Sequence, residues 1–543
     1  MIDEVDPETW RSLYAHLRRE QYPPIDVFKR KASMLFQLSH FGVYFREQFR
    51  MLGDVKLGIL NMGQATVAVP VALGLYGIVS SFSRERKTWV LVFASLLLNS
   101  LGLILFLNFS DAEVRERDYF YGGAFYYFAM YIGIGSTAFL MMLRDGLKEK
   151  GRRAAQVLVP VGVLLLICSL LPAGYQWFRH DRSNNYIPRD YAYNILAGLE
   201  PDAIIFTNGD NDTYPLWYIQ AVEDFRTDVR VVNRMLLNTE WYIKQVRDEE
   251  PKVPITFTDP EIDALIPIGR RDGKVIWVYS QVIQHIITET NWKRPIYFAM
   301  STPPEVWEPY AEYLESHGMI RRLIPYKGRN LSNNFLIARN LDEIFIYRGI
   351  LDEEGKRDHS IYRDETTRGM FVNFAIALFD LSQRLAREGK LDEAISKLER
   401  SLELDPNFPY TKRVLGLYYA RAGEIQKAIE FYERMIAEDP GNGAYWIGLA
   451  SIYENKGESA RALGLAQEGI RAAPDNRDVY GYGFRTAARM GQRDQAVEFI
   501  EMWLSRHPDD KDFRAVLRDV DRILSEEFGD PGDSIDAGTG GSR

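Results

Sequence analysis

Hydrophobic and polar positions divide this chain into an apolar region, an alternating region and a repetitive region. Between residues 57 and 176 the sequence consists of long apolar runs joined by short charged loops. Each run is long enough to cross a bilayer, which takes about 20 residues in a helix. The four runs are residues 57–82, 88–109, 119–143 and 155–176. They predict an α-helical membrane bundle of four spans at 55–177, preceded by a polar segment at 1–54.

Basic residues in the short loops predict how these helices are oriented. The first loop, Ser83–Lys87, and the third loop, Arg144–Arg153, are rich in Arg and Lys, whereas the second loop, Asp111–Asp118, is net acidic. Short loops rich in Lys and Arg stay on the cytoplasmic side of a membrane. We therefore expect residues 1–54 and everything after residue 176 to face the external side.

Beyond the last apolar run, predicted strands alternate with predicted helices. Ala203–Thr207, Val229–Asn233 and Arg294–Met300 read as strands, and Tyr214–Asp224 and Trp307–His317 read as helices. Such alternation implies a parallel sheet with right-handed crossovers. We expect a small Rossmann-like α/β layer at 178–350. The sequence has no G-x-G-x-x-G or Walker pattern, so nucleotide binding is not indicated.

The C-terminal region repeats every 34 residues, which is the period of the tetratricopeptide repeat (TPR). The repeated positions are Pro406, Pro440, Pro474 and Pro508; Ala394, Ala428, Ala462 and Ala496; and Gly389, Gly423, Gly457 and Gly491. A small residue lets two helices approach each other, and glycine ends a helix. We expect an all-α TPR solenoid at 370–527, closed by a capping helix at 510–527. The Gly-, Asp- and Ser-rich residues 528–543 should be disordered.

Charge and cysteine content exclude several classes of protein. The net charge is −9 and the sequence has no extended basic stripe, which argues against a nucleic-acid partner. The single cysteine, Cys168, lies inside an apolar run, so the chain has neither a disulfide framework nor a Cys/His zinc cluster.

Candidate binding residues cluster where the first two predicted strands end. If these strands are neighbours, the polar side chains meet at one rim of the sheet, where α/β proteins bind ligands. The candidates are Asn208, Asp210, Asn211, Asp212, Asn233 and Asn238. Asp210 and Asp212 are also weak metal candidates. Two interpretations stay open: a ligand-binding rim, or Asn and Asp residues that only form turns through local hydrogen bonds.

The sequence assigns no catalytic residue, because no Ser/His/Asp or Cys/His arrangement can be read from it. The aromatic residues near the turn, Trp217, Tyr218, Trp241 and Tyr242, are interpreted as packing residues rather than as sugar platforms.

Several stretches resemble one family, the GT-C-type membrane proteins related to the eukaryotic transmembrane protein O-mannosyltransferase that ends in luminal TPRs. They occur in order along residues 1–350, and the C-terminal repeats are consistent with them. The stretches are Asp6–Trp10, Leu17–Tyr22, Arg117–Tyr121, Ile132–Gly135, Phe206–Tyr218, Val229–Asn233, Leu236–Thr239 and Trp292–Phe298.

The resemblance implies transfer of a sugar from a polyprenyl-phosphate donor to a protein on the outer side of the membrane. It also implies a catalytic general base in an early external loop of an N-terminal membrane half. Since residues 1–54 carry no signal peptide, we expect this chain to be the C-terminal portion of a longer protein, or the partner of an upstream membrane half. For a bacterial member, the α/β and TPR regions would lie in the periplasm and bind the acceptor protein. The alternative is a non-enzymatic membrane scaffold whose repeats recruit an envelope partner.

Overall fold

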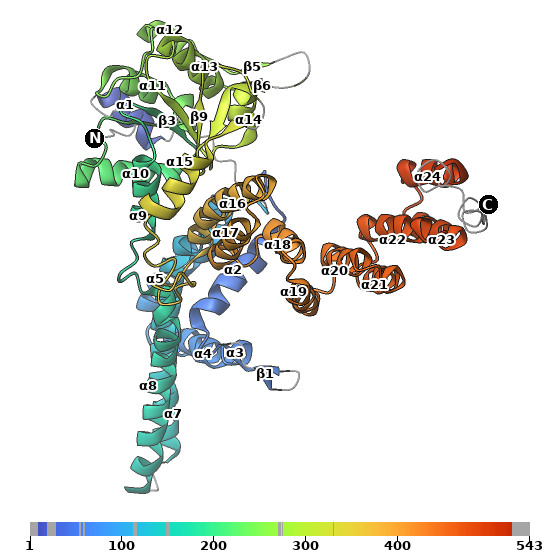
Figure 1. The fold of residues 1–543 in the computed structure, drawn as a ribbon. Coiled ribbons are helices and arrows are strands. Elements are labelled where there is room, and N and C mark those ends of the chain that lie inside the picture. The colour runs from blue at the N-terminus through green and yellow to red at the C-terminus, as the bar shows by residue number, and fades with distance from the viewer. Residues whose placement is uncertain are drawn as a thin grey trace, which may run out of the picture.

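The computed structural model describes residues 9–18, 29–53, 56–57, 60–111, 117–147, 152–269, 273, 275–328 and 331–523. Figure 1 shows three parts: a column of helices, an α/β domain at one end of that column, and a solenoid of helix pairs that extends to the side. The predicted tail at 528–543 and residues 148–151 of the third loop, with Lys148 and Lys150, lie outside the described residues.

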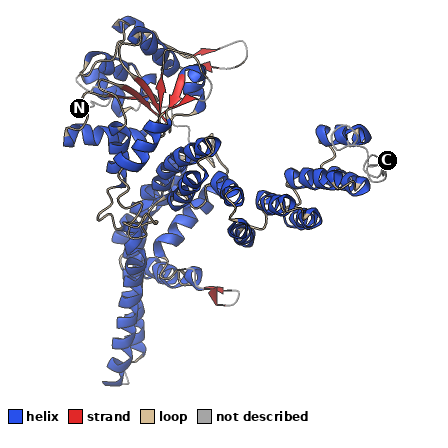
Figure 2. Ribbon diagram, viewed as in Figure 1, coloured by secondary structure: helices blue, strands red, loops and turns tan. Residues whose placement is uncertain are grey.

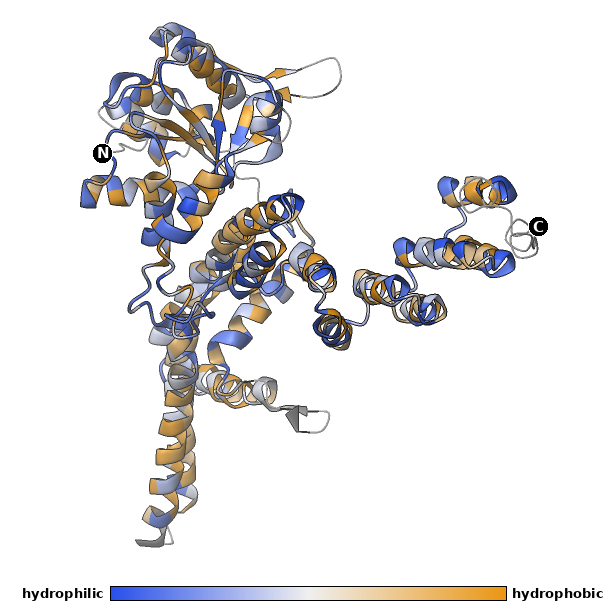
Figure 3. Cartoon of the chain, in the orientation of Figure 1, coloured by the Kyte–Doolittle hydropathy of each residue, from blue (hydrophilic) through white to orange (hydrophobic). Residues whose placement is uncertain are grey.

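The column is the apolar part of the molecule, as the hydropathy colouring shows (Figure 3). Among the described residues, three helical stretches are long and apolar enough to cross a membrane: Arg86–Leu107, Asp118–Gly146 and Ala155–His180. They confirm the predicted runs at 88–109, 119–143 and 155–176. The column is built from α4 (Ala68–Arg84), α5 (Arg86–Leu97), the π-helix η1 (Leu98–Gly102), α6 (Leu103–Leu107), the 3-10 helix η2 (Asp118–Tyr121), α7 (Gly122–Gly146) and α8 (Arg152–His180).

The first predicted span differs from the other three. The run 57–82 begins with a hairpin of β1 (Lys56–Leu57) and β2 (Leu60–Asn61), followed by the short helix α3 (Met62–Ala65). The apolar helix α4 then has 17 residues, which is the lower limit for a membrane span. Continuous helix from residue 57 was therefore the wrong prediction, and the helical part is confined to residues after the hairpin.

Side-chain contacts define the direction of the helices. Gly74 lies against Phe128 and Arg84 lies 3.2 Å from the sulfur of Met141, so α4 and α7 run in the same direction. At the other end of α7, the backbone N–H of Arg117 donates to the hydroxyl of Tyr44 in α2 (Met34–Phe49) at 3.1 Å. The end of α8 reaches the same place, because Gln176 Nε2 donates to the carbonyl of Glu47 at 2.7 Å. Helix α2, the start of α7 and the end of α8 thus share one end of the column.

The sheet of the α/β domain has six strands among the described residues, in the order β10-β8-β9-β7-β3-β4. The three predicted strands pair in parallel, with β3 between β7 and β4. Figure 2 shows the strands enclosed by helices. The strands are β3 (Ile204–Thr207), β4 (Arg230–Asn233), β7 (Ile296–Ala299), β8 (Leu314–Ser316), β9 (Ile320–Leu323) and β10 (Leu331–Ser332); β5 (Ile268–Gly269) and β6 (Val275–Ile276) form a separate hairpin. The helices of this domain are α9 (Ile187–Ala197), α10 (Asp210–Glu223), η4 (Leu236–Asn238), α11 (Glu240–Asp248), α12 (Asp259–Asp263), α13 (Val278–Thr290), α14 (Pro304–Trp307), η5 (Glu308–Tyr313), α15 (Asn334–Arg339) and η6 (Asn340–Ile344).

The sheet is mixed, so the expectation of a wholly parallel layer is wrong. Strand β9 pairs antiparallel with both β7 and β8. The predicted helix Trp307–His317 is replaced by α14, η5 and β8. Gly318, with φ of 91°, forms the turn between β8 and β9 rather than ending a helix. Strand β8 pairs with β9, which in turn pairs with β7, and local sequence preference does not reveal such partners.

The repeat region forms helix pairs with the predicted period (Figure 1). The glycines at 389, 423, 457 and 491 all have positive φ and follow the first helix of each pair. The four repeated alanines, from Ala394 to Ala496, are fully buried. The helices are α16 (Glu365–Arg387), α17 (Leu391–Leu404), α18 (Pro409–Arg421), α19 (Ile425–Glu438), α20 (Gly443–Asn455), α21 (Ser459–Ala472), α22 (Arg477–Arg489), α23 (Arg493–Arg506) and the capping helix α24 (Lys511–Arg518).

The α/β domain and the first repeats share one hydrophobic core. Buried side chains continue from Ile195 and Ile205 through Leu341 to Phe374 and Leu398. This continuity fixes the repeats to the sheet instead of leaving them on a free linker.

Candidate functional site

The carboxyl ends of the parallel strands bring the predicted site residues together. Thr207 of β3 pairs in register with Asn233 of β4, so the residues that follow them, Asn208 and Arg234, are neighbours. Arg234 Nε donates to Asn208 Oδ1 at 2.7 Å. Ser301 follows the third parallel strand, β7, and joins the same rim. The prediction that these strand ends converge is confirmed.

Asp212 is a buried helix cap rather than an open ligand. It lies in the first turn of α10, and its carboxylate accepts hydrogen bonds from the backbone N–H groups of Asn208 at 2.8 Å and Gly209 at 2.9 Å. Ser301 Oγ donates to the same carboxylate. The residue is 5% exposed. Its charge also adds to burial in raising the pKa of Tyr191.

Asn233 is buried as well and holds the loop after β4. Its Nδ2 donates to Thr213 Oγ1 at 3.1 Å, and its Oδ1 accepts from the backbone N–H of Met235 at 2.8 Å. The hydroxyl of Tyr242 accepts a hydrogen bond from the Asn233 N–H at 3.0 Å. Burial raises the pKa of Tyr242 to about 12, so it stays neutral in this role.

The remaining candidates lie at the surface of the rim. Asp210 and Asn211 are exposed in the first turn of α10, and Asn208 is half-buried. Asn238 is exposed, and its side-chain oxygen accepts from the backbone N–H of Tyr279 at 3.3 Å. These four side chains face solvent at least in part, whereas Asp212 and Asn233 face inward.

This arrangement suits hydrogen-bond recognition better than metal binding. The acceptor oxygens of Asp212 are already used by Asn208, Gly209 and Ser301, so Asp210 and Asp212 do not form an open carboxylate pair. Within the part of the chain that the structure describes, no group of three or more His, Cys, Asp or Glu side chains is arranged to hold a metal ion. The rim instead presents amides, one carboxylate and the guanidinium of Arg234.

A groove of about 500 Å³ runs beside α10 on the outer side of edge strand β4. Tyr214 and Tyr218, one helical turn apart, line it and are each 49% exposed. The opposite wall carries the exposed residues Glu249 and Glu250, whose carbonyls accept hydrogen bonds from Arg230 at 3.2 Å. Burial lowers the pKa of that guanidinium. Aromatic faces next to polar groups are common in ligand sites.

Sequence reasoning missed the contributions of Arg234, Ser301 and Tyr218. Arg234 and Ser301 stand next to the ends of predicted strands, which is the signal that could have identified them. The sequence pattern predicts packing for Tyr218, but the side chain is 49% exposed and lines the groove. Helical spacing does not distinguish a residue that lines a groove from one that packs in a core. Both kinds of residue recur at the same spacing along a helix.

Fold and site together define a class of protein: a chain with membrane-spanning candidate helices that carries an α/β domain and a TPR solenoid. Residues 188–273 and 267–340 match the family described as TMEM260-associated domain 2. Residues 379–443 and 419–482 match tetratricopeptide repeat families.

The chain is related to the TMEM260 protein O-mannosyl-transferases. It is 20% identical over 358 residues to Protein O-mannosyl-transferase tmem260 of Dictyostelium discoideum, a match that covers 62% of this chain and 40% of that protein. It is 32% identical over 91 residues to Protein O-mannosyl-transferase TMEM260 of Mus musculus, covering 16% of this chain and 13% of that protein. The chain thus spans less than half the length of these relatives.

Solved structures resemble the repeat region. The crystal structure of TTC0263, a thermophilic TPR protein in Thermus thermophilus, is 22% identical, covers 28% of this chain and 82% of that chain, and has a TM-score of 0.22. The crystal structure of MamA is 22% identical, covers 28% of this chain and 99% of that chain, and has a TM-score of 0.21. Scores this low add nothing to what the repeats themselves show.

Proposed function

We propose that this chain provides the C-terminal part of a polytopic membrane glycosyltransferase-like protein that acts in protein O-glycosylation. In this proposal the sugar comes from a polyprenyl-phosphate donor, and a further membrane half supplies the catalytic general base. This chain binds the acceptor protein and assembles the enzyme. The observation that carries the proposal is the match to the Dictyostelium relative over 62% of the chain.

The proposal includes a fourth membrane span formed by α4. Glycines bring α4 unusually close to α7: a Cβ on Gly77 would lie 2.0 Å from the carbonyl oxygen of Tyr131, and one on Gly135 would lie 1.8 Å from that of Leu73. Small residues that allow close backbone approach are typical of helix pairs in membranes. With four spans, α2 and the α/β domain lie on one side, and the basic residues Arg84 and Arg86 lie on the other.

Acceptor binding is assigned to the groove and the adjoining rim. The parallel half of the sheet has the Rossmann-like property of directing loops from several strands to one edge. Tyr214 and Tyr218 offer stacking faces to a sugar or a peptide, while Glu249, Glu250 and the rim amides offer hydrogen bonds. The sheet itself thereby serves as the rigid support of a recognition surface.

The test measures transfer of labelled sugar from a polyprenyl phosphate to a co-expressed envelope protein. The membranes hold the full chain together with the further membrane half that supplies the general base. The double variant Tyr214→Ala, Tyr218→Ala should lower transfer several-fold. Tyr326→Ala, an exposed tyrosine outside the groove, is the matched control and should leave it unchanged. If no combination of the full chain with a further membrane half transfers sugar, the proposal is overturned.

A second candidate is a non-enzymatic scaffold, favoured by a large hollow in the repeat region. A cavity of about 1150 Å³ lies between α17, α18, α19 and the loop around Lys356. Charged side chains of both signs line it, among them Glu399, Arg400 and Arg434. Capture of one envelope protein by the full chain, lost in Arg400→Glu and independent of any sugar donor, would favour this alternative.

A further inference from the structure

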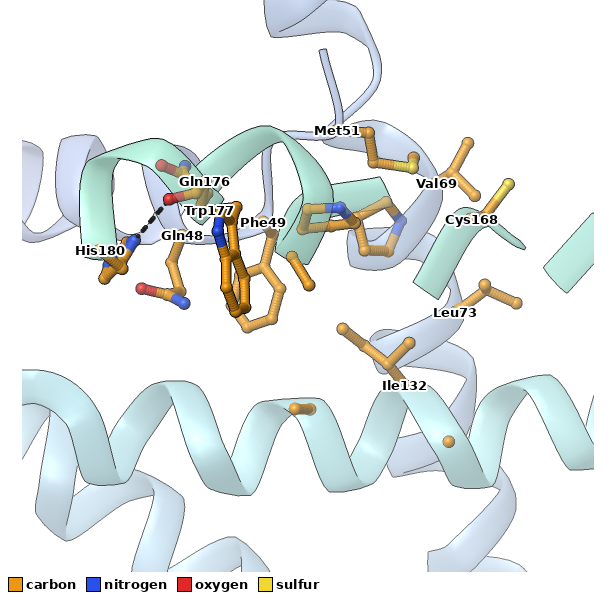
Figure 4. Close-up of a pocket in the computed structure, with 15 residues that line it drawn as sticks. Gln48, Phe49, Met51, Val69, Leu73, Ile132, Cys168, Gln176, Trp177 and His180 are labelled. Carbon is orange, nitrogen blue, oxygen red and sulfur yellow. Dashed lines mark hydrogen bonds between the residues drawn. The ribbon is translucent and has the colours of Figure 1, made fainter. Parts of the chain in front are cut away.

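A separate cavity lies inside the column of helices. It has a volume of about 650 Å³, is partly open to the outside, and is lined by residues of α4, α7, α8 and the end of α2. Figure 4 shows His180 and Gln48 at one end of it, and Cys168 and Leu73 at the other. The cavity is therefore polar towards the α/β domain and apolar towards the middle of the column.

Two polar residues at its polar end, Gln176 and His180, already have partners. Gln176 Nε2 donates to the carbonyl of Glu47 at 2.7 Å, and His180 Nδ1 lies 3.0 Å from the carbonyl oxygen of Gln176. Deeper in the cavity the walls are Leu73, Ile132 and Cys168. Water there would lack hydrogen-bond partners, and an empty space would forfeit dispersion contacts. A hydrocarbon group satisfies both conditions.

Length and charge indicate which hydrocarbon group fits. Cys168 and His180 are twelve residue steps apart along α8, or about 18 Å at 1.5 Å per step. One leaflet of a bilayer contributes about 15 Å of a hydrocarbon core about 30 Å thick. None of the cavity-lining residues, all from the described part of the chain, is Lys or Arg, so nothing in the wall selects a phosphate. An acyl chain of the surrounding phospholipid matches this length and needs no such selection.

Helix α8 is only sparsely covered by the rest of the described chain. In the most apolar window of Ala155–His180, 0% of the residues are buried. We propose that an acyl chain of a bilayer phospholipid occupies the cavity and completes the contact of α8 with α4 and α7. The inference rests on the membrane placement of these helices, and it does not depend on glycosyl transfer. Helix α8 connects to α9 through residues 181–186, so the bound lipid also supports the end of the column nearest the α/β domain.

The test uses the full chain in vesicles that contain a phosphatidylethanolamine with a photoactivatable diazirine in its acyl chain. Adducts of the wild type should map to the peptides that hold Leu73, Ile132 and Cys168. Gly133→Phe should remove most of these adducts, because a Cβ at Gly133 meets no atom within 4 Å and the ring can fill the cavity. Gly162→Phe is the matched control: its Cβ also meets no atom within 4 Å, and it should keep the adducts.

Two further arms make the outcomes decisive. A polyprenyl phosphate carrying the same diazirine competes as the alternative occupant, and adducts formed with it alone would overturn the assignment to phospholipid. Equal adducts in Gly133→Phe and wild type, or adducts confined to residues outside the cavity, would overturn the site. Flotation with the vesicles is scored first: a chain that does not float refutes the membrane placement and the inference with it. Loss of glycosyl transfer alone refutes only the proposed function.

Discussion

Asp210 and Asp212 stand two residues apart, yet they lie in opposite environments. Asp210 is exposed in the first turn of α10, and Asp212 is 5% exposed beneath it. A helix periodicity of 3.6 residues turns these neighbours to different faces. The same Asp-x-Asp spacing would have placed both carboxylates together on an extended loop. The helical start of α10 therefore decides that one acid is structural and the other faces solvent.

Asp212→Asn is expected to destabilise the protein by about 1–3 kcal/mol, because a side-chain NH₂ group would face the partly buried N–H groups of Asn208 and Gly209. Urea unfolding of the full chain in detergent micelles, followed by tryptophan fluorescence, measures this. Asp210→Asn should stay within about 0.5 kcal/mol of wild type, as exposed substitutions do. Equal stability of the two variants would contradict the capping role.

The ion pair of Asp228 and Arg226 makes stability depend on pH. The Arg226 side chain lowers the pKa of Asp228 from 3.8 to about 2. Because the folded state holds this proton less tightly than the unfolded state, the pair stabilises the fold above pH 3.8, and that contribution is lost as the pH falls towards 2. In Asp228→Asn, the free energy of unfolding should fall less steeply across this window. Asp224→Asn, at an exposed position on the same loop, should keep the wild-type slope.

At the scale of secondary-structure elements, close packing of α4 on α7 depends on glycine. Gly77 and Gly135 leave backbone against backbone, and any Cβ there would overlap a carbonyl oxygen. Gly133, two residues away on α7, has open space beside it. The α4–α7 pair should therefore be sensitive to larger side chains at Gly77 and Gly135 and should tolerate them at Gly133.

Gly77→Leu should destabilise the membrane part by about 1–3 kcal/mol through overpacking. Unfolding of the full chain in detergent by sodium dodecyl sulfate measures this change. Gly133→Ala is the control and should be neutral or slightly stabilising, since alanine favours helix by about 0.5–1 kcal/mol over glycine. A Gly77→Leu protein as stable as wild type would show that α4 does not pack on α7 in this way.

The repeat region offers a similar test. Ala428 is 0% exposed between helices α18 and α19, so Ala428→Leu should cost about 1–3 kcal/mol. Ala437→Leu adds the same side chain at an exposed position of α19 and should change stability little. Thermal unfolding followed by circular dichroism at 222 nm, where helix dominates the signal, compares the two variants. Equal melting of both would contradict the helix-pair assignment.

At the scale of the whole molecule, the structure joins distant parts of the chain at one end of the column. Residues of α2, the start of α7 and the end of α8 contact each other there. The α/β domain continues from α8, and its core continues into the repeats. A ligand on the α/β domain is therefore held at a fixed position relative to the first repeats.

Labelling of single cysteines from outside the cell tests this topology. In a Cys168→Ser background, Ser39→Cys and Ser183→Cys should react with an impermeant maleimide, whereas Ser83→Cys should react only after permeabilisation. All three serines are exposed. A different result is that only one of Ser39→Cys and Ser183→Cys reacts from outside. These residues would then lie on opposite sides of the membrane, so α4 would not cross it and the chain would have an odd number of spans.

The sequence by itself determined those features that depend on local periodicity. Apolar runs identify the long helices, and the 34-residue period locates the helix pairs with their glycine turns and buried alanines. It also identified the first three strands, since short apolar runs followed by turn residues are local signals. Even the convergence of Asn208 and Asn233 followed from the rule that parallel strands end at one edge.

Only the tertiary structure decided the features that depend on partners far away in the chain. Strand β8 exists because β9 lies beside it, and the buried Asp212 carboxylate is held by Ser301 and by the backbone before α10. The lipid-sized cavity likewise needs α4, α7 and α8 together. Long-range contacts set these outcomes, and their free energies outweigh the local preferences that a sequence pattern can report.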